Sequence, residues 1–254
     1  MSDRDDVLPL PGDYVALVRG LLDSGYEIRG FANVEPDKPH LILRHDVDIS
    51  IEHARRLAEI EHQELGVSAS YFILLRTEFY NPFSKENTQH LKAMIAMGHE
   101  IGLHIDFSLY GDSTFHHHVI RESRILTDIL DVPIYLVSFH RPSTLMKGKD
   151  YQSISLPGFV SAYDKRVFSD IGFVSDSRGG WYHGHPLEHP AVKARRALQL
   201  LTHPIWWTSD GADENARDLL KHYARANARQ MLHSFHRNFR ILRDSDLGDD
   251  APKP

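Results

Sequence analysis

Residues that could bind a metal or transfer a proton occur in five short polar groups, each directly after an apolar run. The groups are residues 44–48 (Arg-His-Asp-Val-Asp), 104–106 (His-Ile-Asp), 140–142 (His-Arg-Pro), 176–178 (Asp-Ser-Arg) and 202–204 (Thr-His-Pro). Imidazole nitrogen and carboxylate oxygen together suit zinc, iron, nickel or cobalt. The chain has 18 histidines and no cysteine. A metal site here would therefore use histidine and carboxylate, and thiolate ligands are excluded.

Side-chain alternation along a strand indicates which of these residues act together. Asp46 and Asp48 are two positions apart and share a face, whereas His45 points the other way. Two ionised carboxylates in a dry cleft need a compensating cation. We therefore expect Asp48, His104 and His140 to form a two-histidine, one-carboxylate set for one divalent ion, expected to be zinc, with a position open for water.

The remaining polar residues have the chemistry of proton transfer around such an ion. Asp46 would be the general base that takes a proton from the water. Arg141 would hold Asp46 ionised through a charge-assisted hydrogen bond. His203 would be the acid that protonates the leaving group, and Asp176 would orient His203 or bind substrate.

Other interpretations of these residues stay open at this stage. The two aspartates could cap a helix that starts near Ser50. His45 is the alternative third ligand, if a bulge turns it to the other face. The run 183–189 holds three histidines and is a rival metal group, and the histidines at 116–118 favour an exposed helix start.

Apolar runs that alternate with helical periodicity must position these groups. Strands are expected at 41–43, 67–75, 101–105, 134–139, 159–162, 173–174 and 198–201, and helices at 13–23, 51–65, 85–97, 115–130 and 212–242. This order predicts parallel βαβ units closed into an α/β barrel of about seven strands. All five polar groups would then meet at the rim formed by the strand C-termini, where such barrels build active sites.

Length and charge limit the possible classes of protein. The 254 residues predict one domain over 1–254, with flexible ends at 1–12 and 244–254. A net charge of −6 argues against general nucleic-acid binding. No apolar run reaches the roughly 18 residues of a membrane helix, and no secretory signal is evident. We therefore expect a cytoplasmic protein without stable membrane insertion.

Over residues 41–207 the chain resembles the polysaccharide deacetylase superfamily (the NodB-homology domain, carbohydrate esterase family 4). The Asp46/Asp48 pair stands where that family has an Asp-Asp pair. The run Gly-His-Glu-Ile-Gly-Leu-His at 98–104 matches its histidine motif. Further motifs are matched by Arg-Pro at 141–142, Asp176 with Trp181, and Leu-Thr-His at 201–203.

The resemblance implies a deformed barrel of about seven strands that removes acetyl groups from sugars with the help of a metal. Two departures stand out: Val47 separates the two carboxylates, and Ser108 replaces the second histidine of the pair. His140 is our candidate for the missing ligand. The Arg-His-Asp-Val-Asp variant is similar to a divergent branch associated with bacterial surface-polysaccharide biosynthesis (WbmS-like proteins).

The expected function is removal of an acetyl group from an N-acetylated sugar, carried as a nucleotide-linked or lipid-linked precursor. Two alternatives stay open. One is a hydrolase of the same fold that acts on another C–N bond, such as a ureide or a cyclic amide. The other is a non-catalytic sugar-binding member of the pathway.

Overall fold

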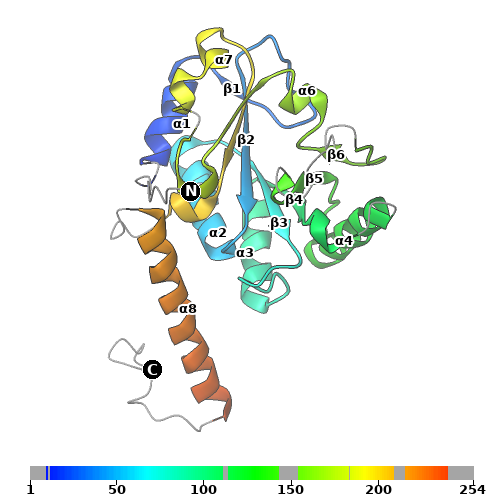
Figure 1. The fold of residues 1–254 in the computed structure, drawn as a ribbon, viewed down its shortest axis with the longest axis vertical. Helices are drawn as coiled ribbons and strands as arrows, with labels where there is room; N and C mark the ends of the chain where they lie inside the picture. Colours follow the sequence, from blue (N-terminus) through cyan, green and yellow to red (C-terminus); the bar gives the residue numbers. More distant parts are fainter. Residues whose placement is uncertain are drawn as a thin grey trace, which may run out of the picture. The chain divides into compact units, whose positions relative to one another are not determined.

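The computed structural model describes residues 10, 12–110, 114–142, 154–182, 184–208 and 215–239 (Figure 1). Residues Pro11–Thr208 form one compact unit, which contains all the strands of the described part. A second unit comprises Met1–Leu10 and Ser209–Pro254. Its described part is mainly the helix α8 (Ala216–Phe239). The flexible ends expected at 1–12 and 244–254 lie outside the described residues, Leu10 and Gly12 excepted, and the single-domain expectation stays a prediction.

Seven parallel strands form the main path of the sheet, in the order β6-β5-β4-β3-β2-β8-β7. Their bounds are β2 His40–Val47, β3 Ser70–Leu74, β4 Glu100–Ile105, β5 Leu136–Phe139, β6 Val160–Ser161, β7 Gly172–Ser175 and β8 Leu198–Thr202. The two-residue strand β1 (Glu27–Ile28) extends the sheet beside the start of β2. The expected α/β barrel of about seven parallel strands is thus confirmed, as a half-barrel.

Side-chain contacts bridge the gap between the two outer strands, β6 and β7, which are not hydrogen-bonded to each other. Gln199 on β8 reaches across it, and its amide nitrogen donates to the carbonyl oxygens of Ala162 at 3.2 Å and Val167 at 2.5 Å. The rings of Phe168 and Phe173 pack against each other there, with centroids 4.7 Å apart. Residues at the ends of β5 and β8 accordingly line one cleft on the concave side of the sheet.

Four helices of this unit lie where the sequence periodicity predicts them: α1 Tyr14–Asp23, α2 Ile51–Ile60, α3 Lys85–Ala96 and α4 Phe115–Leu130. The sequence did not predict the short helices α6 Lys165–Phe168 and α7 Pro190–Lys193. Ser50 and Ser84 cap α2 and α3, each accepting a backbone N–H three residues later. Helix α2 continues as a turn of π-helix over Glu61–Leu65. None of the described helices is both long enough and apolar enough to cross a bilayer.

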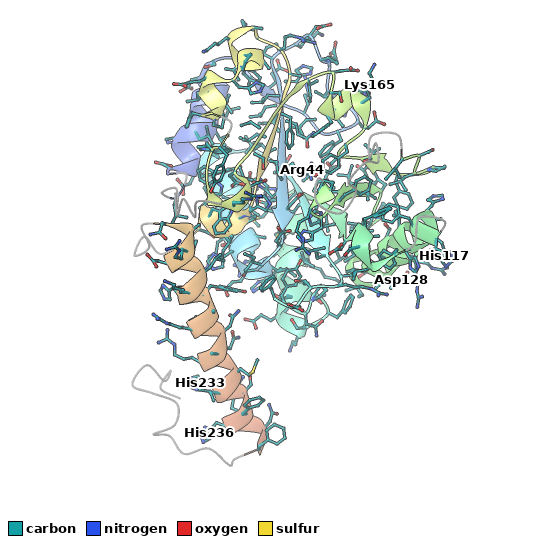
Figure 2. All side chains as sticks on the ribbon, in the orientation of Figure 1. Arg44, His117, Asp128, Lys165, His233 and His236 are labelled. Carbon is teal, nitrogen blue, oxygen red and sulfur yellow. The ribbon has the colours of Figure 1, made fainter. Side chains whose placement is uncertain are left out.

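A glycine of the 98–104 run makes room for the core beside the site. A Cβ on Gly102 would lie 2.7 Å from the ring of Phe72 and 3.0 Å from Leu136. Phe72 in turn lies under the guanidinium of Arg44, 5.5 Å from ring centroid to Cζ. Figure 2 shows Arg44 amid the packed side chains of the sheet, whereas His117 lies at the outer edge on α4. The histidines at 116–118 thus start a helix, as expected.

Candidate metal centre and active site

The carboxylate of Asp46 is bound by an arginine of its own strand. Arg44 donates from Nε to Oδ1 at 3.0 Å and from Nη2 to Oδ2 at 2.8 Å, a two-point ion pair between buried side chains. The pair forms because residues two apart on β2 point to the same, concave, face. Burial alone would raise the pKa of Asp46, but Arg44 and then His104 hold it below its usual value. Asp46 is therefore an ionised carboxylate inside the barrel.

Arg44 is itself held by three other strands or their ends. Its Nη1 donates to Gln199 Oε1 at 3.0 Å, and its Nη2 donates to Ser138 Oγ at 2.5 Å and to the Tyr163 hydroxyl at 2.9 Å. The guanidinium also lies over the Tyr163 ring, 4.6 Å from the centroid. Because these partners come from β5, β8 and the end of β6, the curl of the sheet is what completes the arginine's hydrogen bonds.

The partner predicted for Asp46 was wrong. Arg141 lies on the cleft, 61% of its side chain is exposed, and it faces Asp106 at 3.4 Å. Arg141 follows the end of β5 and lies on the rim, whereas Arg44 lies within β2 and points directly into the barrel. Arg44 is therefore the arginine that reaches the Asp46 carboxylate. Strand alternation could have identified Arg44, since it shares a face with Asp46.

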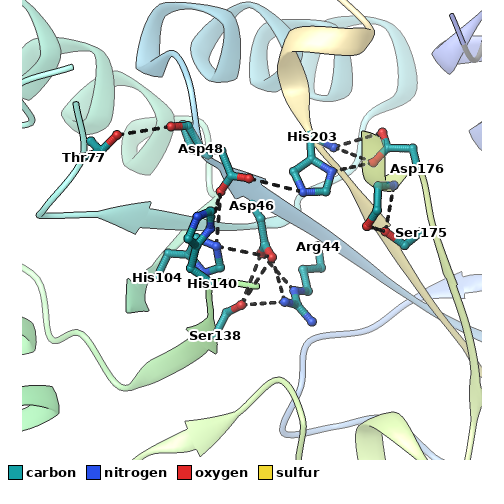
Figure 3. A network of polar contacts seen from close by, with 12 residues as sticks. Arg44, Asp46, Asp48, Thr77, His104, Ser138, His140, Ser175, Asp176 and His203 are labelled. Carbon is teal, nitrogen blue, oxygen red and sulfur yellow. Dashed lines mark hydrogen bonds and ion pairs between the residues drawn. The ribbon is translucent and has the colours of Figure 1, made fainter. Parts of the chain in front are cut away.

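Asp48 lies at the centre of the group that could hold a metal (Figure 3). Its Oδ1 is 3.3 Å from His104 Nε2 and 3.3 Å from His140 Nδ1. One ligand atom from each of the three residues lies within 4.8 Å of the others. Burial alone would raise the pKa of Asp48, but the two histidines, joined by His203, hold it well below its usual value. The structure therefore brings together the three residues expected to bind metal.

The donor set fits a divalent transition metal. Ligand bonds of about 2.0 Å in a tetrahedron place neighbouring ligand atoms roughly 3.3 Å apart, which matches the separation of Asp48 Oδ1 from each histidine nitrogen. Asp48 Oδ1 is also buried with no hydrogen-bond partner among the described residues. A buried carboxylate oxygen without a donor is costly, and a cation at this position would satisfy it.

Replacing His140 tests this ligand set. In His140→Ala, we expect the metal content of the purified protein to fall from about one ion per chain to near zero after dialysis, because two ligands hold such an ion far less tightly than three. Elemental analysis measures it, and His117→Ala, on the exposed start of α4, is the matched control. If His140→Ala keeps its full metal content and His45→Ala loses its metal, the third ligand is His45 and not His140.

His203 faces the metal group from the opposite side of the cleft. Its Nε2 lies 3.7 Å from Asp48 Oδ2, and its Nδ1 lies 2.6 Å from Asp176 Oδ1. Asp176 is fully buried and also accepts from the His203 backbone N–H and from Trp207 Nε1. Burial alone would lower the pKa of His203, but Asp176 and then Asp48 and Asp46 raise it to about 9. At neutral pH the imidazole carries a proton that it can donate.

The replacement of a motif histidine by Ser108 has a structural counterpart. Ser108, which stands in the place of a histidine, donates from its N–H and its hydroxyl to Asp106 Oδ1, so that Asp106 caps a short turn. His140 supplies the nearby imidazole instead. His45 points to the far side of β2, as alternation predicts, and has no contact with Asp48.

A second buried polar network on that far side escaped the sequence analysis. Glu61 accepts hydrogen bonds from the hydroxyls of Tyr14 and Tyr71, and its Oε1 lies 2.9 Å from His45 Nε2. His45 Nδ1 in turn lies 2.7 Å from Thr202 Oγ1. The signal was present, since Glu61 continues the apolar positions 54, 57 and 58 of α2. The network ties β2 to β8 directly behind Asp46 and His203.

The pH dependence of stability should report on Glu61. Burial would raise its pKa, but His45 and the tyrosine hydroxyls lower it below the ordinary value of 4.5. A lowered pKa stabilises the fold above the unfolded-state value, and that contribution is lost as pH falls through the folded-state value. We expect Glu61→Gln to lose about 1–3 kcal/mol of unfolding free energy at pH 7.

The difference between the variant and the parent chain should shrink as pH falls through the lowered pKa of Glu61. Urea unfolding at several pH values between 7 and 3 measures this, with the exposed Glu64→Gln as control. A constant difference between Glu61→Gln and the parent across the whole range would contradict the assignment.

Both halves of the site open onto one cleft of about 580 Å³. Asp46, Asp48, His104, His140 and His203 line it. The rival histidines at 183–189 do not take part: His183 lies outside the described residues, and His185 and His189 cap short turns.

Comparison with known proteins gives structural similarity without a family match. The sequence matches no family model and no curated protein. Solved structures of family 4 carbohydrate esterases are similar at low identity. The catalytic domain of a peptidoglycan N-acetylglucosamine deacetylase from Eubacterium rectale is 12% identical, over 77% of this chain and 87% of that one, with a TM-score of 0.45.

Two further structures illustrate the range of these proteins. The peptidoglycan deacetylase PdaC from Bacillus subtilis is 15% identical, over 81% of this chain and all of that one, with a TM-score of 0.42. A family 4 pseudoenzyme from Bacillus anthracis is 14% identical, with a TM-score of 0.39, and the match covers 76% of this chain but only 63% of that protein. The similarity concerns the fold, and the narrower polysaccharide-biosynthesis branch stays a prediction.

Proposed function

We propose that this chain is a metal-dependent hydrolase that removes the acetyl group from an N-acetylated sugar. The observation that carries the proposal is the position of Asp48, between two histidines at 3.3 Å on one side and His203 on the other. A metal group, an ionised carboxylate and a protonated imidazole thereby line one cleft. Together these three groups can supply the electrophile, the base and the acid of a metal-assisted amide hydrolysis.

Asp48, His104 and His140 are the residues that would hold the ion. A divalent metal bound by this set supplies Lewis acidity, which polarises an acetyl carbonyl and makes water easier to deprotonate. The low pKa of Asp48 keeps that carboxylate charged and available as a ligand at neutral pH.

Asp46 and His203 perform the two proton transfers. Asp46, held ionised by Arg44, accepts a proton from the attacking water as its oxygen bonds to the acetyl carbon. His203 then donates its Nε2 proton to the departing sugar nitrogen as the C–N bond breaks. Asp176 keeps the His203 ring oriented through Nδ1 and favours its protonated form. The products are acetate and the free amino sugar.

Acetate release tests the proposal. The full-length protein, loaded with Zn²⁺, Co²⁺ or Ni²⁺ in turn, is incubated with N-acetylglucosamine, chitobiose and nucleoside-diphosphate N-acetylamino sugars, and acetate is measured. We expect release that stops after chelation and returns on adding metal. Binding of these sugars with no acetate released under any metal would overturn the proposal in favour of a sugar-binding protein.

A further inference from the structure

Two arginines outside the proposed catalytic set line the same cleft. Arg141 directly follows His140 at the end of β5, and Arg178 lies in the short turn Ser177–Gly179 after β7. Both side chains are exposed at the rim. They therefore flank Asp48 and His203 from two different strand ends.

Both arginines have a backbone conformation that residues with a Cβ rarely adopt. The φ angle is +45° at Arg141 and +67° at Arg178. Within the described residues, the other non-glycine cases are Asp131, which ends α4, and Arg195. Such strain persists where the surroundings enforce it, and it concentrates at ligand-binding positions.

Neither arginine is paired with Asp46, Asp48 or Asp176. Asp46 is paired with Arg44, and Asp176 is paired with His203. Arg141 forms an ion pair with Asp106 at 3.4 Å, while 61% of its side chain stays exposed. Arg178 has no acidic partner among the described residues. Two exposed guanidinium groups are therefore available at this cleft, one of them without an ion-pair partner in the described part of the chain.

A buried donor in the cleft wall also lacks an acceptor. Trp206 lines the cleft and is 8% exposed, and its Nε1–H has no hydrogen-bond partner among the described residues. An unpaired buried donor is costly and points to an acceptor supplied by a ligand. The cleft thus presents three donor side chains, two of them guanidinium groups, whose geometry suits phosphate oxygens.

We propose that the cleft binds its sugar through a diphosphate group, with Arg141 and Arg178 contacting the phosphate oxygens. The inference rests on the proposed function, because it names the class of acetylated sugar that the site would take: one joined to a diphosphate. Nucleotide-linked and lipid-linked sugars share this chemistry, and the arms of the test below separate them.

Binding of small diphosphates to the chelator-treated full-length protein tests the two arginines apart from any metal. The probes are inorganic pyrophosphate, UDP and geranyl diphosphate, measured by calorimetry. Arg141→Gln and Arg178→Gln should each raise Kd about tenfold, because a hydrogen bond to a charged group is lost. Glutamine keeps the Cβ, so the backbone strain is unchanged.

Arg195→Gln is the matched control. Arg195 also has a positive φ, +54°, and is exposed, but it contacts the Ser24 carbonyl oxygen before β8 begins, away from the rim that holds the site. Its substitution should leave Kd unchanged. Equal affinities in all three variants and the parent chain, or no binding of any probe, would overturn the proposal.

Comparing the probes identifies the group attached to the diphosphate. Tighter binding of UDP than of pyrophosphate supports a nucleotide, and tighter binding of geranyl diphosphate supports a lipid. Arginine-dependent binding without acetate release supports this inference while the hydrolase proposal fails. If the protein releases acetate from uncharged sugars and binds no diphosphate, the hydrolase proposal holds and this inference fails.

Discussion

Asp46→Asn is expected to lower kcat by roughly 10²–10⁴-fold, the range that general base catalysis contributes, while metal content stays near one ion per chain. Asparagine has almost the same shape as aspartate but cannot take a proton from water. The metal set uses Asp48, so its ligands are unchanged. Initial rates of acetate release and elemental analysis on the same preparation measure the two quantities.

Ser138→Ala is the matched control for Asp46→Asn. Ser138 Oγ lies 3.4 Å from both carboxylate oxygens of Asp46, so the variant removes a neighbour of the base and leaves the base in place. We expect less than a tenfold loss of kcat. Normal turnover in Asp46→Asn, with Ser138→Ala equally active, would rule out Asp46 as the base.

Arg44→Gln is expected to destabilise the fold by about 3–5 kcal/mol, because it leaves the Asp46 carboxylate buried without its ion pair. For a domain of this size that corresponds to a fall in Tm of roughly 6–20 °C. The surviving folded protein should also lose activity, since an unpaired buried carboxylate is protonated more readily and the protonated form cannot accept a proton from water. Thermal unfolding followed by circular dichroism measures the first effect.

Two comparisons isolate the ion pair from simple loss of packing. The double variant Arg44→Gln with Asp46→Asn should be less destabilised than the sum of the single variants, because neither buried charge is left alone. Arg141→Gln, at an exposed arginine, should change Tm little. Additive losses in the double variant, or a matching loss in Arg141→Gln, would show that Arg44 does not hold Asp46 as described.

The sequence alone allowed prediction of the order of the strands and the main helices, and of the three residues that form a group able to hold a metal. Caps such as Ser50 and Ser84 and the periodicity of apolar residues act over a few residues, so they are readable without a structure. Asp48, His104 and His140 were found in the same way. Each follows an apolar run, and parallel strands bring their C-terminal ends to one rim.

The surroundings of the Arg44–Asp46 pair were decided only by the tertiary structure. Side-chain alternation places Arg44 on the same face as Asp46, so this partner was readable from the sequence. Only the folded sheet brings Gln199, Ser138 and Tyr163 around the Arg44 guanidinium. These contacts join residues up to 155 positions apart, which no local pattern encodes.

The network around Glu61 and the two arginines at the cleft also depend on long-range packing. A buried glutamate on an apolar helix face is visible in the sequence, but its partners Tyr14, His45 and Tyr71 come from three separate elements. Arg141 and Arg178 are 37 positions apart and meet only because β5 and β7 end at one cleft. Local periodicity therefore places side chains on a face and at a rim, and long-range packing selects the contacts they make there.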